Sequence, residues 1–137
     1  MPVVEKQIAL KELFLGFSSS DEKYQKIIEM GRALPPLSPT ARTPENLVRG
    51  CQSILYLETR FQDGLIYFQA GSEALISKGL AALLIHVYSG EPPESLFKHP
   101  PLFLQEIGLY QALSPSRSNG LLSLYKKMQQ DAIKVLN

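Results

Sequence analysis

The stretch "QSILYLETRFQDGLIYFQA", residues 52–70, predicts a β-hairpin and thereby decides the fold. Residues 52–61 and 65–70 are rich in aromatic, aliphatic and β-branched side chains, which favour strands. Between them lies "QDG", in which Gly64 can adopt the positive φ of a tight hairpin turn. We expect two antiparallel strands over these ranges, and a short third strand at residues 46–48.

Helical patterns precede the hairpin. Apolar side chains recur at helical spacing over residues 10–17 and again over residues 24–34. Ser19 followed by Glu22 is a capping box, so the second helix is expected to begin near residue 20. Its end is marked by two successive prolines, Pro35 and Pro36, and the proline-rich residues 35–44 predict a loop.

Helices also follow the hairpin. Residues 73–88 are apolar on most sides, which predicts a helix buried against the sheet. Short helices are expected after "SGEPP" and around residues 102–108, and a long amphipathic helix from residues 114–118 to 136. Because strands and helices do not alternate, the pattern predicts an α+β fold, a small antiparallel sheet of two or three strands packed against several helices. We expect residues 1–137 to form a single domain.

Composition excludes several function classes. The 137 residues are 45% hydrophobic, enough for a real core, and the net charge of +1 comes from mixed charges that predict neither a nucleic-acid partner nor a membrane surface. The longest mostly apolar run, residues 79–87, is far shorter than the roughly 20 residues of a membrane span. Charges near the N-terminus argue against a signal peptide, and one cysteine cannot form an internal disulfide, so a reducing cytoplasm is expected.

That single cysteine, Cys51, lies between Gly50 and the first predicted strand. A lone cysteine is usually a small buried hydrophobe, but glycine beside a strand start places this one near a loop tip, where a thiol can meet a partner. A cation such as Arg49 or Arg42 would favour the reactive thiolate if it pointed at the sulfur, although a solvated arginine is the commoner situation.

Other chemistries have weaker support. A cysteine hydrolase would need His86 or His99 as its base, but His86 at the end of an apolar helix is expected to be a core residue and His99 a surface turn residue. One cysteine and two dispersed histidines lack metal-ligand spacing, and the glycines form no phosphate-binding motif, so we expect neither a metal nor a cofactor. Arg117, in "LSPSRSNGL" at residues 113–121, opposes the helix dipole at a helix start and is expected to serve something outside the helix.

Three segments in order carry a resemblance: "RTPENLVRGCQS", "SKGLAALLIHVYSGEPPESL" and "IGLYQALSPSRSNGL". Over about residues 24–135 the chain resembles the SufE family of sulfur-acceptor proteins, although Tyr56 and Ser72 replace a tryptophan and an acidic residue common there. The resemblance implies that Cys51 accepts persulfide sulfur from a pyridoxal-phosphate cysteine desulfurase, SufS-like, stimulates that enzyme, and passes sulfur to an iron–sulfur scaffold. The protein would then be a carrier and activator without turnover of its own.

The resemblance also implies which residues face the desulfurase. Gly50 would be the hinge of a loop that hides and releases Cys51. The expected partner-binding residues are Arg49, Gly50, Gln52, Ser53, Lys78 and Arg117. For Lys78 and Gln52 a surface lysine and a strand-start hydrogen bond remain open alternatives. Two other functions also stay open: the hydrolase using Cys51 with His86 or His99, and a scaffold that keeps Cys51 without relaying sulfur.

Overall fold

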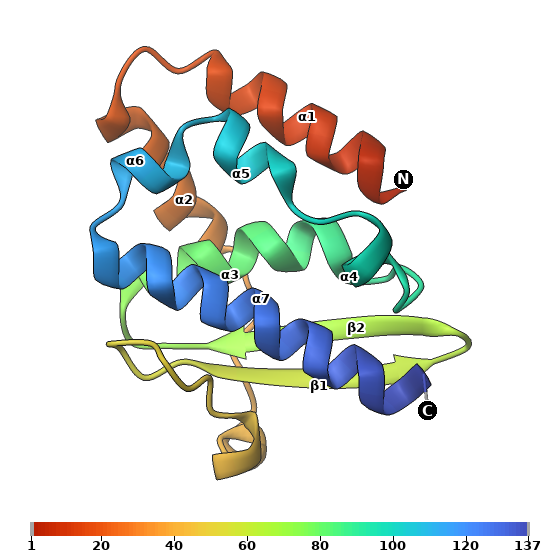
Figure 1. The fold of residues 1–137 in the computed structure, drawn as a ribbon. Coiled ribbons are helices and arrows are strands. Elements are labelled where there is room, and N and C mark those ends of the chain that lie inside the picture. The colour runs from red at the N-terminus through yellow and green to blue at the C-terminus, as the bar shows by residue number, and fades with distance from the viewer. Residues whose placement is uncertain (1, 137) are drawn as a thin grey trace.

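A computed structural model describes residues 2–136 and confirms the predicted α+β architecture (Figure 1). One two-stranded antiparallel sheet is packed against helices. The elements in chain order are α1 (Val3–Leu15), α2 (Ser20–Arg32), the 3₁₀ turns η1 (Pro39–Ala41) and η2 (Pro44–Asn46), β1 (Tyr56–Gln62), β2 (Leu65–Gly71), α3 (Leu75–Tyr88), α4 (Ser95–Lys98), α5 (Leu102–Glu106), α6 (Leu109–Ala112) and α7 (Pro115–Leu136).

The hairpin forms as predicted, with Tyr56 opposite Gly71 and Gln62 opposite Leu65. Its two turn residues, Asp63 and Gly64, have φ of 54° and 80°, the positive values of a type I′ turn. The first strand starts four residues later than predicted, because residues 52–55 belong to the loop that carries Cys51 and do not pair with β2. The predicted third strand at residues 46–48 is reduced to an isolated bridge between residues 47 and 56.

Helix α3 lies at the centre of the molecule, between the hairpin and α1 (Figure 1). Nearly all of its side chains from Leu80 to Tyr88 are buried, which confirms the predicted core helix. Helix α7 crosses the hairpin and turns a buried stripe inward at helical spacing. That stripe consists of Leu121, Leu124, Met128 and Ala132.

Helices α2 and α3 approach so closely that glycine is required on both. A Cβ built on Gly79 would lie 2.3 Å from the carbonyl oxygen of Ile27, and one built on Gly31 would lie 2.7 Å from the backbone nitrogen of Gly79. Real Cβ atoms do not come that close, so the two backbones touch directly. This contact fixes the first turn of α3, which lines the candidate site described below.

Local signals explain most element boundaries. The Ser19 hydroxyl accepts a hydrogen bond from the Glu22 backbone N–H (3.2 Å), as the capping box predicted, and the Glu22 carboxylate accepts one from the Ser18 N–H (3.2 Å). Gly108, with φ of 71°, separates α5 from α6, a four-residue helix that the sequence did not indicate. Within residues 2–136, no helix combines the length and the hydropathy that crossing a membrane requires.

Candidate functional site

The loop that carries Cys51 is pinned at both ends. At its start the Val48 N–H donates to the Leu55 carbonyl (2.8 Å), which closes the loop at its base. At its end the Ser72 hydroxyl donates to the Ile54 carbonyl (2.7 Å) and accepts from the N–H of Ala74, just before α3. These hydrogen bonds hold the base of the loop on the hairpin and next to the start of α3.

Gly50 is the residue at which this loop needs glycine. Its φ is 90°, in the region that other residues rarely adopt. A Cβ at this position would also lie 2.5 Å from the Ser123 hydroxyl oxygen on α7. The backbone before Cys51 thus turns sharply while it lies directly against α7.

The Cys51 thiol is half-buried against the same helix. Its Sγ lies 3.5 Å from the carbonyl oxygen of Gly120, to which it donates a weak hydrogen bond. Gly120 has no side chain, and a Cβ built there would lie 3.4 Å from Sγ, an ordinary van der Waals distance. Burial raises the pKa of Cys51, so the resting thiol is held in its protonated, weakly nucleophilic form.

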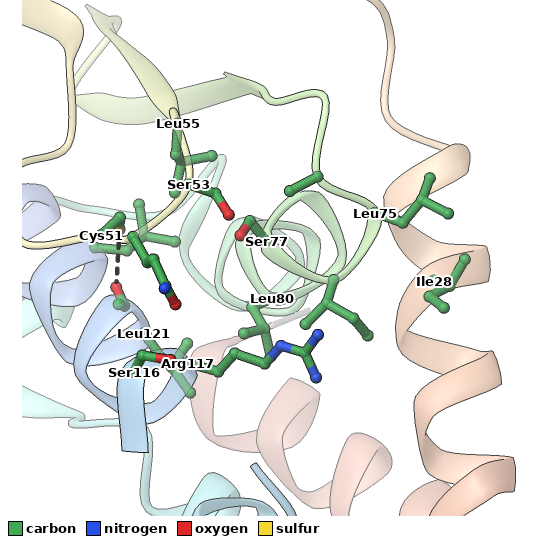
Figure 2. A pocket seen from close by; sticks show the side chains of 15 residues that line it. Ile28, Cys51, Ser53, Leu55, Leu75, Ser77, Leu80, Ser116, Arg117 and Leu121 are labelled. Carbon is green, nitrogen blue, oxygen red and sulfur yellow. Dashed lines mark hydrogen bonds between the residues drawn. The ribbon is translucent and has the colours of Figure 1, made fainter. Parts of the chain in front are cut away.

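Cys51 opens into a cavity of about 400 Å³ between the loop, α3 and α7, which we call the thiol cavity (Figure 2). Its walls are mostly apolar, with serine hydroxyls, one amide and one guanidinium as the polar groups. The lining residues are Ile28, Cys51, Gln52, Ser53, Leu55, Ala74, Leu75, Ile76, Ser77, Leu80, Ser116, Arg117, Gly120, Leu121 and Leu124. An apolar space of this size next to a thiol can hold further atoms bonded to that sulfur.

The predicted cations do not surround the sulfur. Arg117 extends from α7 along the cavity wall near Leu80, with its guanidinium directed away from Cys51 (Figure 2). Arg42 lies 4.0 Å from the Glu73 carboxylate. Arg49 is exposed and lines a second depression on the surface. Because none of these three arginines offsets the effect of burial, the pKa of the Cys51 thiol is raised.

The structure divides the six predicted partner-binding residues into three groups. Gln52, Ser53 and Arg117 line the thiol cavity, whereas Arg49 and Gly50 line the neighbouring depression. Lys78, half-buried on α3, lines neither. The structure thus brings five of the six to the surroundings of Cys51.

Neither histidine accompanies the thiol. His86 is exposed, so the expectation of a core histidine was wrong: it occupies a solvent-facing position of α3. His99 is the C-cap of α4 and is half-buried, and its backbone carbonyl accepts a hydrogen bond from the Tyr88 hydroxyl (2.6 Å). The residues lining the thiol cavity include no histidine, and within residues 2–136 no group of three or more His, Cys, Asp or Glu side chains could hold a metal ion. A cysteine–histidine pair therefore has no geometric support.

Sequence reasoning missed the residues of α3 and α7 that form the back of the site. The one local signal was Gly120, because glycine inside a helix costs about 1 kcal/mol relative to alanine and often marks a close approach. Ser77, Leu80, Leu121 and Leu124 had no signal that distinguished them from ordinary core or surface positions of a helix.

Comparison with known proteins places this site in a family. A family model described as SufE, an Fe–S metabolism associated domain, matches residues 8–132. The chain belongs to the SufE family. This membership gives the protein a role in Fe–S metabolism, the process named by the family description.

Relatives within the SufE family come from plants and bacteria. The chain is 38% identical over 136 residues to SufE-like protein 1, chloroplastic/mitochondrial, of Arabidopsis thaliana, covering 96% of this chain but only 37% of that longer protein. It is 34% identical to an uncharacterised SufE-like protein of Synechocystis sp., covering 89% of this chain and 77% of that one. A SufE-like protein of Rhizobium etli is 36% identical, with 87% and 84% covered.

A solved structure shares the fold of this SufE-family chain. The solution structure of a hypothetical protein from Thermus thermophilus superposes with a TM-score of 0.81 at 26% sequence identity, covering 96% of both chains. The arrangement of helices around the hairpin that positions Cys51 is thus a fold already seen in another protein.

Proposed function

We propose that this protein accepts a sulfur atom from a cysteine desulfurase onto Cys51, stimulates that enzyme and delivers the sulfur for iron–sulfur cluster assembly. The observation that carries the proposal is the thiol itself: the chain's lone cysteine follows a glycine bend and opens into an apolar cavity with room for a second sulfur. Family membership in Fe–S metabolism supports the same direction.

The chemistry needs no group beyond the two thiols. The Cys51 thiolate attacks the terminal sulfur of a cysteine persulfide on the donor, as a thiolate attacks a disulfide. The sulfur–sulfur bond of the donor breaks, a new one forms on Cys51, and the donor cysteine leaves as a thiolate that takes up the proton lost by Cys51. No oxidant or reductant is consumed, because the sulfur–sulfur bond is exchanged and not created.

The half-buried position of the thiol supports a role for the loop in sulfur transfer. In the resting position the sulfur is half-buried and its pKa is raised, so both access and nucleophilicity require it to leave the Gly120 carbonyl. Gly50 supplies the backbone freedom for that movement. A partner that draws the loop outward would expose the sulfur to water and restore a lower thiol pKa at the moment of transfer.

The thiol cavity would then protect the product. A persulfide in contact with solvent is open to oxidants and free thiols, whereas one that returns between Leu55, Leu80 and Leu121 is shielded by apolar side chains. The polar groups at the cavity wall, including Gln52 and Ser77, can hydrogen-bond to the sulfur without adding charge.

The test is intact-mass analysis after incubation with an active cysteine desulfurase and free cysteine. We expect the wild-type protein to gain sulfur at Cys51, and the Cys51→Ser variant to gain none and to stimulate the desulfurase weakly or not at all. Absence of added sulfur on the wild-type protein would refute the relay. Unchanged stimulation by the serine variant would instead favour a scaffold.

The same experiment addresses the hydrolase alternative. His86→Ala and His99→Ala should acquire sulfur at the wild-type rate, because neither histidine lines the thiol cavity. Labelling of Cys51 by an electrophilic activity probe that is lost in either histidine variant would favour a cysteine–histidine hydrolase.

A further inference from the structure

A depression lined by four basic side chains and one carboxylate, that of Glu45, adjoins the Cys51 loop, and we call it the basic groove. It has a volume of about 770 Å³ and runs between the loop, η2 and α7. Its lining residues are Pro44, Glu45, Leu47, Arg49, Gly50, Ser123, Lys126, Lys127, Gln130 and Lys134. Arg49 and Gly50 line this groove, and the next residue, Cys51, lines the thiol cavity. The two depressions therefore meet where the loop turns at Gly50.

Most of the positive charge in the basic groove has no partner within the molecule. Arg49, Lys126 and Lys134 are exposed, and no ion pair among residues 2–136 joins any of them to a carboxylate. Lys127 differs, because it pairs with Asp131 (3.4 Å) and donates to the Glu45 carbonyl (3.0 Å). The chain as a whole carries only +1, so the groove concentrates positive charge that is balanced elsewhere on the surface.

The spacing of the cations suits an extended chain better than a single small anion. Lys126, Gln130 and Lys134 lie at i, i+4 and i+8 of α7, on one face of the helix. At 1.5 Å of rise per residue the two lysines are separated by about 12 Å along the helix. A strand of about four residues has that length, whereas one phosphate or carboxylate reaches only one end of the row.

We propose that the basic groove binds an acidic segment of the desulfurase, the protein that donates sulfur to Cys51. The inference rests on the proposed function and adds the surface by which the donor is recognised. The donor is favoured over a downstream acceptor because the thiol must leave the Gly120 carbonyl before it can attack a persulfide, and the groove includes the part of the loop that would move. A carboxylate on Arg49, two residues from Cys51, would hold the loop at that point.

The test is desulfurase stimulation measured against carrier concentration for the Lys126→Glu/Lys134→Glu variant. At low ionic strength we expect the apparent KM for the carrier to rise roughly tenfold with little change in kcat, because exposed ion pairs govern encounter more than chemistry. The matched control is Arg32→Glu/Lys98→Glu, which changes net charge equally at exposed positions that line neither the groove nor the thiol cavity. Its KM should stay within about twofold of wild type.

Salt supplies an independent readout. Wild-type KM should rise as ionic strength increases, since the Debye length falls from about 10 Å at 0.1 M to about 3 Å at 1 M, and this dependence should be lost in the groove variant. A milder variant, Lys126→Gln/Lys134→Gln, serves if charge reversal impairs folding, and should show a smaller rise in KM of the same kind.

The outcomes separate this inference from the proposed function. Equal KM values for the groove variant and wild type, or equal rises in the groove and control variants, would overturn the docking surface while sulfur transfer to Cys51 stands. A defect confined to transfer from Cys51 to an acceptor would overturn the assignment to the donor. Failure of the wild-type protein to acquire sulfur would remove the proposed function itself.

Discussion

Two glycines set the environment of the Cys51 thiol, and they do so in different ways. Gly50 permits a backbone turn with φ of 90°, whereas the carbonyl oxygen of Gly120 accepts the weak hydrogen bond from the sulfur. Gly120 has ordinary helical geometry within α7, so its own helix gains nothing from glycine there. A Cβ there would meet the sulfur at 3.4 Å, an ordinary contact distance, so the thiol does not require glycine at this position either.

We predict that Gly120→Ala stabilises the fold and leaves the thiol in place. Replacing a helical glycine by alanine should raise the free energy of unfolding by about 0.5–1 kcal/mol. The new methyl group would lie 3.4 Å from Sγ, in ordinary van der Waals contact, so the rate at which iodoacetamide alkylates Cys51 should change little. Thermal unfolding and alkylation kinetics on the same samples measure both effects.

Asn119→Ala is the control for this prediction, because Asn119 is exposed on the same turn of α7 and does not line the thiol cavity. It should gain some helix stability without any change in the alkylation rate. Clearly faster alkylation in Gly120→Ala would show that the methyl group displaces the sulfur and that the contact requires glycine.

The bend at Gly50 beside Cys51 could be predicted from sequence, because a glycine–cysteine pair before a strand is a local pattern. The back wall of the thiol cavity could not. Leu80 and Leu121 belong to helices whose stripes look like ordinary core, and only the tertiary packing of α3 beside α7 leaves a cavity between them. The charge of the basic groove was also hidden, since Arg49 and Lys134 are 85 positions apart in a chain of nearly neutral composition.

At the scale of elements, the contact between α2 and α3 determines where the thiol cavity lies. Helix α3 begins beside the cavity, and its first residues, from Leu75 to Ser77, form one wall. Its position depends on the direct backbone contact between Gly31 and Gly79. Any side chain at that crossing would push α3 away from α2.

We therefore predict that Gly79→Ala destabilises the protein by about 3 kcal/mol, at the upper end of overpacking costs, because its Cβ would meet the Ile27 carbonyl, which cannot move aside. Urea denaturation measures the change. Gly16→Ala is the matched control, since Gly16 has φ of −75° at the C-cap of α1 and the nearest atom to a Cβ there would be the Leu13 carbonyl oxygen, at 3.3 Å. A loss below about 1 kcal/mol for Gly79→Ala would mean that the crossing adjusts.

Element boundaries followed the sequence wherever a local signal existed. The Ser19 cap, the Gly64 turn and the amphipathic α7 were predictable because each depends on neighbouring residues alone. The start of β1 at Tyr56 was not predictable, because residues 52–55 also resemble a strand in sequence. In the structure Gln52, Ser53 and Leu55 line the thiol cavity, and the Ile54 carbonyl accepts a hydrogen bond from Ser72.

At the scale of the whole molecule, the proposed recognition surface and helix α1 lie on different sides of the core. The thiol cavity and the basic groove share the Cys51 loop and α7, whereas α1 packs on α3 and α5 on the far side of the core from the hairpin (Figure 1). Helix α1 buries Val3, Leu10 and Phe14 in the core, and a polar contact adds to this packing. Lys6 pairs with Glu91 (2.8 Å) and donates to the carbonyls of Val87 and Ser89 at the end of α3.

Separation of the two sides predicts that Lys6→Ala lowers stability without impairing sulfur uptake. Both partners of the Lys6–Glu91 pair have only 14% of their side-chain surface exposed, so removing the lysine leaves a largely buried carboxylate and should cost about 2 kcal/mol. Lys11→Ala is the control, because the Lys11–Glu106 pair is 39% and 46% exposed and should contribute less than about 0.5 kcal/mol. At temperatures well below their unfolding midpoints, both variants should acquire sulfur on Cys51 at the wild-type rate in the mass assay. A slower rate for Lys6→Ala in the folded protein would show that α1 and the Cys51 loop are coupled through α3.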